Sequence, residues 1–185
     1  YLNHIPFADH GALLDPPTAD VTARCVGMLA QLNAEKYTSE ITCGVDYLKA
    51  DQEEDGSWFG RWGTNYVYGT WSVLCALNAA GEDMNAPYIR KSVDWVKSQQ
   101  REDGGWGEDG STYWEETKNI IKASTASQTS WAILGLMAAG EADSKSVERG
   151  VKFLIKSPRT GSTWKEPWYT AVGFPKVFYL KYHGY

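Results

Sequence analysis

Two seven-residue stretches, QEEDGSW (52–58) and QREDGGW (100–106), decide the fold of this chain. Both have the pattern Q-x-x-D-G-x-W, and each begins five residues after the start of an aromatic–aliphatic pair, Tyr47-Leu48 or Trp95-Val96. Repetition at a fixed period is the sequence signature of repeat proteins, in which each unit buries its apolar face against the next. We therefore expect a structural unit that recurs about every 50–60 residues.

A third, degenerate copy begins at Phe153-Leu154. It keeps its tryptophan, but Pro158 stands where glutamine is expected and Gly161 comes one place early. We expect a structural role for the glutamines and tryptophans of all three copies: Gln52, Trp58, Gln100, Trp106 and Trp164. The glutamine at the end of one helix can bond backbone groups left unpaired at the next helix terminus. The indole can stack on that amide and cover the loop.

A second repeated pattern consists of GTWSVLCALNAAGE (69–82) and QTSWAILGLMAAGE (128–141), which align at their threonines and share the ending A-A-G-E. The stretch VTARCVGMLAQL (21–32) is a weaker relative. Its apolar residues recur at helical spacing and predict one apolar face of a helix. These residues are Val21, Cys25, Met28, Leu29 and Leu32.

Helix ends are also marked in the sequence. Thr125 with Gln128 fits a capping box, and Gly81 and Gly140 suit the position just after a helix. Further helices are expected where the motifs begin, over Ser92–Ser98 and Ser146–Ile155. Strand signals are weak. The order of helix, motif loop and helix predicts an all-α protein whose paired helices form a solenoid or a closed α/α toroid.

Composition excludes some classes of protein. The 185 residues are 43% hydrophobic, so we expect a globular chain with a real core. The net charge of −5 argues against a nucleic-acid partner, because phosphate binding needs a basic face. The sequence contains no signal peptide and no run of 18 apolar residues that would span a bilayer.

Cysteine and histidine spacings give no metal-ligand pattern, so no metal site and no cofactor are expected. Each cysteine falls in a helical pattern, and we expect small buried thiols at Cys25, Cys43 and Cys75. The histidines are expected to be structural or exposed: His4, His10 and His183.

Taken in order, the motifs resemble the QW repeats of triterpene cyclases, and of bacterial squalene–hopene cyclases in particular. The resemblance covers nearly the whole chain. Besides the repeats it rests on Ile5-Pro6-Phe7, Asp15-Pro16-Pro17 with Asp20-Val21-Thr22, GSWFGRWG (56–63), NYVYGT (65–70), and Gly173-Phe174-Pro175 with Phe178-Tyr179-Leu180.

The resemblance implies that residues 1–185 are the C-terminal part of a catalytic α6/α6 barrel. The family starts its reaction with an aspartic acid in a D-x-D-D motif, and no such motif occurs in residues 1–185. We therefore expect a fragment that lacks the D-x-D-D part and the second barrel, and that is inactive alone.

For the full-length protein, the resemblance implies an enzyme of hopanoid biosynthesis, an isomerase or lyase that works without a cofactor. It would convert squalene into pentacyclic hopene or hopanol by an acid-initiated carbocation cascade. The family also implies a homodimer bound peripherally to the cytoplasmic side of the bacterial inner membrane.

Three polar residues match family positions near the initiating acid. Asp20 and Arg24 are i,i+4 on one expected helix, so they can pair with each other. By resemblance they orient the acid and stabilise its anion, although Arg24 stands where the family has histidine and its fixed charge cannot relay a proton. Tyr68 matches a tyrosine near the initiation end that holds water. The alternative for Asp20 and Arg24 is an ordinary surface pair.

Aromatic residues match positions that stabilise cations through their π faces without reacting with them. By resemblance, Trp62, Phe174 and Phe178 face the cationic intermediates. Other aromatic residues match positions around the cavity or its channel: Phe7, Tyr179, Tyr182 and Tyr185. The alternative for each is core packing.

Two other readings remain open. Protein prenyltransferase β subunits share the α/α barrel and isoprenoid chemistry, but they need an Asp/Cys/His zinc site that is not apparent here. A non-catalytic α/α-toroid binding module is the alternative outside the enzymes.

Overall fold

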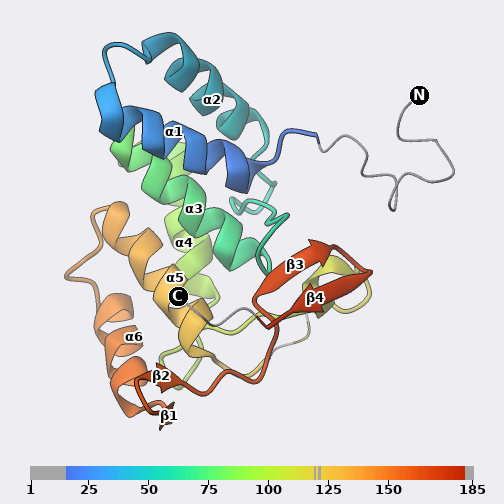
Figure 1. Ribbon diagram of the computed structural model, residues 1–185. Coiled ribbons are helices and arrows are strands. Elements are labelled where there is room, and N and C mark those ends of the chain that lie inside the picture. Colours follow the sequence, from blue (N-terminus) through green and yellow to red (C-terminus); the bar gives the residue numbers. More distant parts are fainter. Residues whose placement is uncertain (1–15, 119, 121, 182–185) are drawn as a thin grey trace, which may run out of the picture.

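The computed structural model describes residues 16–118, 120 and 122–181, and it is helical over most of that length. Three helices lie side by side as one layer, with α3 between α1 and α5 (Figure 1). The other three pack against them as a second layer. The helices are α1 (Ala19–Asn33), α2 (Thr38–Ala50), α3 (Tyr66–Ala79), α4 (Pro87–Ser98), α5 (Ala126–Ala138) and α6 (Lys145–Lys156). The predicted all-α class is confirmed.

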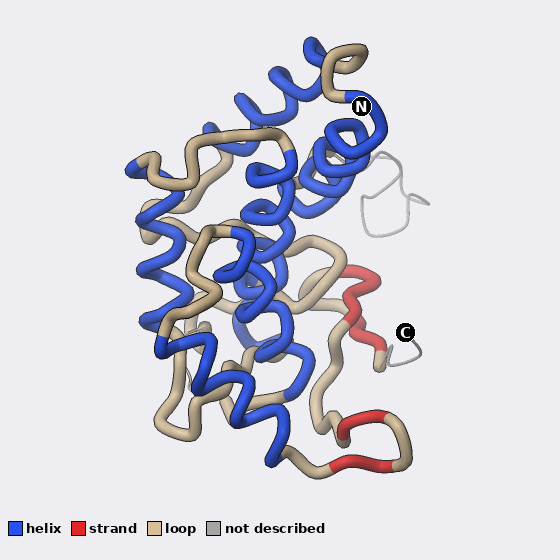
Figure 2. Tube along the Cα trace, turned by 90° about the vertical axis from the view of Figure 1, so that its left-hand side faces the viewer, coloured by secondary structure: helices blue, strands red, loops and turns tan. Residues whose placement is uncertain are grey.

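Four short strands follow α6, in a region where the sequence shows only weak strand signals. Strands β1 (Arg159–Thr160) and β2 (Thr163–Trp164) form one antiparallel hairpin, and β3 (Ala171–Phe174) and β4 (Phe178–Leu180) form another. Both hairpins lie on the same side of the helices (Figure 2). No helix within the described ranges is long and apolar enough to cross a membrane.

The predicted glycine ends of α3 and α5 are confirmed. Gly81 and Gly140 have φ angles of 80° and 81°, in the left-handed region that favours glycine. The N–H of the following residue reaches back to the last turn in both helices, from Glu82 to Leu77 O and from Glu141 to Leu136 O. These bonds satisfy carbonyls that would otherwise be unpaired.

Only half of the predicted capping box forms at the start of α5. The Thr125 hydroxyl accepts a bond from the N–H of Gln128 at 3.3 Å. The Gln128 side chain does not return to Thr125. It donates instead to Thr64 O at 2.6 Å, while the N–H of Thr125 donates to Trp106 O. Gln128 therefore ties α5 to a distant loop.

The motif tryptophans occupy equivalent places in all three copies. Each indole N–H donates to a carbonyl in the last turn of the preceding helix, at 2.7 Å to Leu48 O, 2.7 Å to Val96 O and 2.9 Å to Leu154 O. The donors are Trp58, Trp106 and Trp164 respectively. The tryptophan thus satisfies a carbonyl at the end of the preceding helix, which lacks an intrahelical partner.

The motif glutamines bond backbone carbonyls at the start of the next outer helix, and so join successive outer helices. Gln52 Nε2 donates to Tyr88 O in the first turn of α4 at 2.9 Å, and Gln100 Nε2 donates to Ser146 O in the first turn of α6 at 2.8 Å. No helix follows α6 within the described residues, so a glutamine at Pro158 would have no equivalent carbonyl to bond.

The apolar face predicted for α1 is not the face on which this helix packs. Val21, Met28 and Leu32 are 46%, 51% and 67% exposed. The helix packs through its small residues, because Gly27 brings its backbone close to Ala76 of α3. The prediction of buried thiols is also wrong for Cys25 and Cys43, which are exposed, and Cys75 is half-buried.

Candidate active site

Asp20 is a buried carboxylate that holds the loop of the candidate site. It lies in the first turn of α1 and is 1% exposed. Its Oδ1 accepts hydrogen bonds from the Thr18 hydroxyl at 2.6 Å and the N–H of Val21 at 3.0 Å. Its Oδ2 accepts bonds from the N–H groups of Arg61 at 3.1 Å and Trp62 at 2.8 Å. These four bonds use about all the lone pairs that a carboxylate offers.

The predicted pairing of Asp20 with Arg24 does not occur. Arg24 is exposed, and its guanidinium lies over the ring of Trp71, 4.4 Å from the ring centroid. Asp20 forms no ion pair with it, because the carboxylate faces the backbone of Arg61 and Trp62 instead.

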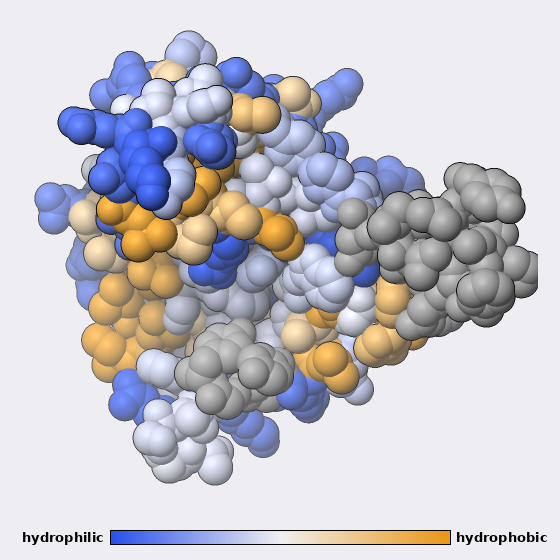
Figure 3. Space-filling view, turned by 45° about the horizontal axis from the view of Figure 1, so that its top comes forward, coloured by the Kyte–Doolittle hydropathy of each residue, from blue (hydrophilic) through white to orange (hydrophobic). Residues whose placement is uncertain are grey.

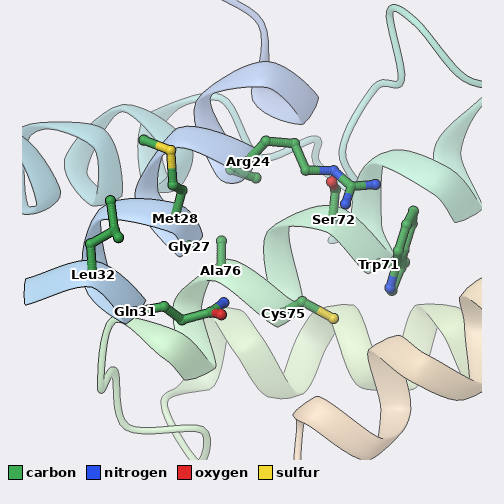
Figure 4. Close-up of a pocket in the computed structure, with 10 residues that line it drawn as sticks. Arg24, Gly27, Met28, Gln31, Leu32, Trp71, Ser72, Cys75 and Ala76 are labelled. Carbon is green, nitrogen blue, oxygen red and sulfur yellow. The ribbon is translucent and has the colours of Figure 1, made fainter.

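Arg24 borders a groove of about 570 Å³ between α1 and α3. Figure 4 shows Met28 and Leu32 on the α1 side of this groove and Trp71 and Cys75 on the α3 side. Met28 and Leu32, two of the exposed apolar side chains of α1, therefore line this groove. Apolar side chains also gather along one side of the face in Figure 3.

Three residues predicted to face cations are brought together around Arg61. The Arg61 guanidinium lies 4.2 Å from the ring centroid of Trp62 and 5.3 Å from that of Phe174, and it donates to Gly173 O at 2.9 Å. Phe174 packs against Phe178 across the β3–β4 hairpin with ring centroids 5.6 Å apart. One face of Trp62 is therefore covered by Arg61.

Tyr68 lies in a separate aromatic cluster. Its ring centroid is 5.1 Å from that of Trp131 and 5.7 Å from that of Trp71, and the two indoles stack with their planes 13° apart. A Cβ atom at Gly63 would meet the Tyr68 ring at 2.6 Å. This glycine therefore lets the ring lie directly against the loop that carries Trp62.

Tyr179 of β4 is held through both its hydroxyl and its ring. The hydroxyl donates to Gly110 O at 3.3 Å and accepts from the N–H of Lys176 at 2.9 Å. The ring stacks on Tyr113, with centroids 5.9 Å apart. Phe7, Tyr182 and Tyr185 lie outside the described residues.

A larger cleft, of about 1070 Å³, opens between the two motif loops. Its wall carries many charges: Glu53, Glu54, Asp55, Arg101, Glu102, Asp103, Glu108, Lys118 and Lys122. Burying so many charges against a hydrocarbon would leave them without water or partners, so this cleft does not suit an apolar substrate.

Glu108 at the edge of this cleft is buried, and its carboxylate accepts bonds from the N–H groups of Tyr66 and Val67, both at 2.9 Å. It therefore caps the start of α3. Burial raises the pKa of Glu108 above its ordinary value of 4.5, and the bonds from Val67 and Tyr66 act in the opposite direction.

Sequence reasoning missed Arg61, Trp71, Tyr113 and Trp131. Trp71 and Trp131 stand one and two places after the aligned threonines, Thr70 and Thr129, so they do not align with each other and the repeat did not single them out. Arg61 and Tyr113 act through contacts with distant segments, and no local pattern reveals such contacts. Among the described residues, no cluster of three or more His, Cys, Asp or Glu could hold a metal ion.

Comparison with known proteins gives consistent matches. The family model for the squalene-hopene cyclase C-terminal domain matches residues 1–185. A squalene–hopene cyclase from Bradyrhizobium diazoefficiens is 60% identical over the whole chain, which covers 28% of that relative. One from Alicyclobacillus acidocaldarius is 48% identical over 99% of the chain, which covers 29% of it.

A solved structure supports the fold. The ent-copalyl diphosphate synthase from Streptomyces platensis aligns with a TM-score of 0.64 at 22% identity, over 86% of this chain and 30% of that protein. The chain thus spans less than a third of the length of these relatives.

Proposed function

This chain belongs to the squalene–hopene cyclase family and corresponds to its C-terminal domain. The family assignment decides against the protein prenyltransferase reading. Because the chain is less than a third as long as its curated relatives, the activity discussed below is that of the full-length protein.

We propose that the full-length protein converts squalene into pentacyclic hopene or hopanol by an acid-initiated carbocation cascade. The observation that carries the proposal is the meeting of Trp62, Phe174 and Phe178, which come from opposite halves of the chain. Trp62 and Phe178 are 40% and 43% exposed, so each has a free surface that a substrate could cover. Their π faces can stabilise a cation without trapping it, at about 0.5–2 kcal/mol each.

In this proposal Asp20 acts through the loop that it holds. Its carboxylate already accepts four bonds, two of them from the backbone of Arg61 and Trp62. It therefore fixes Trp62 and supplies a buried negative charge at the start of α1. Arg24 stacks on Trp71, so its charge acts over the Tyr68 cluster.

Tyr68 is proposed to lie near the initiation end. Tyr179 is proposed to support from behind the aromatic wall, which is the set of Trp62, Phe174 and Phe178. The hydroxyl and ring of Tyr179 already contact Gly110 and Tyr113, which supports a backing role. The motif glutamines and tryptophans join the helices and remain outside the chemistry.

We also propose a homodimer bound peripherally to the cytoplasmic side of the bacterial inner membrane. Squalene is a hydrocarbon that partitions into bilayers, so an enzyme at the membrane surface receives substrate without carrying it through water.

The test is incubation of purified full-length protein with squalene, followed by gas chromatography of the extract. We expect pentacyclic hopene or hopanol as the main products. Recovery of unchanged squalene from folded protein, in detergent and in lipid vesicles alike, would contradict the proposal.

A further inference from the structure

The loop that carries Trp62 is held from several sides. We call residues 59–65 the Trp62 loop. It joins the first motif to α3. Asp20 binds two of its N–H groups, and Gln128 donates to Thr64 O. Asn65 Oδ1 accepts from the N–H of Gly60 at 3.0 Å and so closes the loop on itself.

Tyr113 binds this loop at two points that straddle Trp62. It ends the short 3₁₀ helix η3 (Gly110–Tyr113). Its hydroxyl lies 2.5 Å from Gly60 O and 2.9 Å from Gly63 O. One O–H group is thus shared between two carbonyls, one on each side of Arg61 and Trp62.

The Trp62 loop is closely packed, so a single hydroxyl can determine its position. A Cβ atom at Gly60 would meet Asn65 O at 2.3 Å, and one at Gly63 would meet the Tyr68 ring at 2.6 Å. The loop is packed against Tyr68, and Tyr113 bonds its carbonyls. Loss of the Tyr113 bonds would leave two buried carbonyls without a donor, so the loop would have to shift to find one.

The ring of the same tyrosine contacts two further aromatic residues. Its ring packs edge-on against Phe59 with centroids 5.4 Å apart and stacks on Tyr179 at 5.9 Å. Tyr113 is 6% exposed, and burial raises the pKa of its hydroxyl above the ordinary value of 10, with Glu108 and Asp20 raising it further. The hydroxyl therefore remains a proton donor to the loop at any working pH.

We propose that Tyr113 is a positioning residue of the cyclase. Through its hydroxyl it fixes the Trp62 loop, and through its ring it holds Tyr179 of β4, so it sets the position of Trp62 relative to the hairpin that carries Phe174 and Phe178. This inference rests on the proposed cyclase function. It assigns no chemical step to Tyr113.

The experiment uses full-length wild-type protein and Tyr113→Phe, which keeps the ring and removes only the hydroxyl. Tyr88→Phe is the matched control, because Tyr88 lies on the outer helix α4 and its hydroxyl bonds Glu82, in the loop before that helix. We expect squalene turnover by Tyr113→Phe to fall by about 10-fold and incompletely cyclised products to rise, because a displacement of about 1 Å is enough to impair such a reaction. Tyr88→Phe should keep the wild-type product ratio.

Crystal structures of wild type and Tyr113→Phe give the second measurement, and Trp62 should shift in the variant. If the wild type makes no cyclised product, the proposed function fails, while the position of Trp62 still decides the role of Tyr113. An unmoved Trp62, or a folded Tyr113→Phe with wild-type turnover and products, would overturn the inference. A lower melting temperature with an unchanged product ratio would show that Tyr113 is only a core residue.

Discussion

At the scale of single residues, Asp20 has its hydrogen-bonding capacity filled by the protein itself, and it acts by holding the loop that carries Trp62. A carboxylate accepts about four hydrogen bonds, and Asp20 accepts four, two of them from the backbone beside Trp62. Hydrogen bonds to a charged group contribute about 1.5–3 kcal/mol each, roughly twice the value of neutral ones. The placement of Trp62 therefore depends on the charge of Asp20.

Replacement of Asp20 by asparagine in the full-length protein should slow squalene turnover at least about 10-fold. An amide offers one oxygen, so its NH2 group must face backbone donors on one side, and the bonds to Trp62 or to Val21 weaken. Turnover per folded molecule, measured by gas chromatography, checks this. Asp46→Asn serves as the control, because Asp46 is an exposed residue of α2. Wild-type turnover in folded Asp20→Asn would show that the bonds to the loop do not matter.

At the scale of elements, the starts of α3 and α5 are capped by loops that come later in the chain. Glu108 accepts from the first N–H groups of α3, and Glu166 Oε1 accepts from the N–H of Ser127 at the start of α5. Each glutamate stands two residues after a motif tryptophan. The first copy has Gly60 at this position and so has no such carboxylate in its loop. There the carboxylate belongs to the helix, because Asp20 of α1 accepts hydrogen bonds from N–H groups of the loop.

Glu108 should make the free energy of unfolding depend on pH. Its pKa is raised in the folded protein, so the native state holds the proton more tightly than the unfolded state. The contribution of Glu108 to stability is therefore fully present below pH 4.5 and is lost as pH rises through the folded-state pKa. Glu108→Gln should remove this slope, so its free energy of unfolding should gain relative to wild type as pH rises above about 4.5.

Glu141 provides a control of opposite sign. Bonds from Lys97 and Arg90 lower its pKa, so its stabilisation is present above pH 4.5 and is lost as pH falls. Urea unfolding of wild type, Glu108→Gln and Glu141→Gln between about pH 3.5 and about pH 8 measures both effects. As pH rises, the free energy of unfolding relative to wild type should increase for Glu108→Gln and decrease for Glu141→Gln. Parallel curves for wild type and Glu108→Gln would contradict the assignment.

The sequence predicted the helices well because their signals are local. Apolar spacing and the glycines at 81 and 140 identify α3 and α5 directly. The packing face of α1 was not predictable in the same way. Small residues such as Ala23 and Gly27 allow close approach to α3, whereas the large apolar residues Met28 and Leu32 border the groove. Hydrophobicity alone cannot distinguish a face that packs from one that lines a groove.

At the scale of the whole molecule, the candidate site forms where distant segments meet. The backbone of Gly63 pairs with Ala171 of β3, and the N–H of Val172 donates to Trp62 O at 3.1 Å. These bonds bring the β3–β4 hairpin to the Trp62 loop. The family resemblance named Trp62, Phe174 and Phe178, but Arg61 between them and Tyr113 beneath the loop became visible only in three dimensions.

The last prediction concerns the β3–β4 hairpin, and it distinguishes a role of Phe178 in stabilising a cation from a role in packing. Phe178 is 43% exposed, whereas Val172 in the same hairpin is 2% exposed. Phe178→Ala in the full-length enzyme should change the melting temperature little if no substrate is bound, because the ring buries limited surface. It should still release partly cyclised products, because a late cation loses its π stabilisation.

Val172→Ala should behave in the opposite way. Removal of buried methyl groups leaves a small cavity and costs about 1–3 kcal/mol, so the melting temperature should fall. The product ratio of the remaining folded enzyme should stay close to that of wild type, since Val172 presents almost no surface to a substrate. Gas chromatography beside a melting curve for each variant distinguishes the two effects. If Phe178→Ala melts early and still makes only the wild-type pentacycle, then Phe178 is a packing residue and the aromatic wall ends at Phe174.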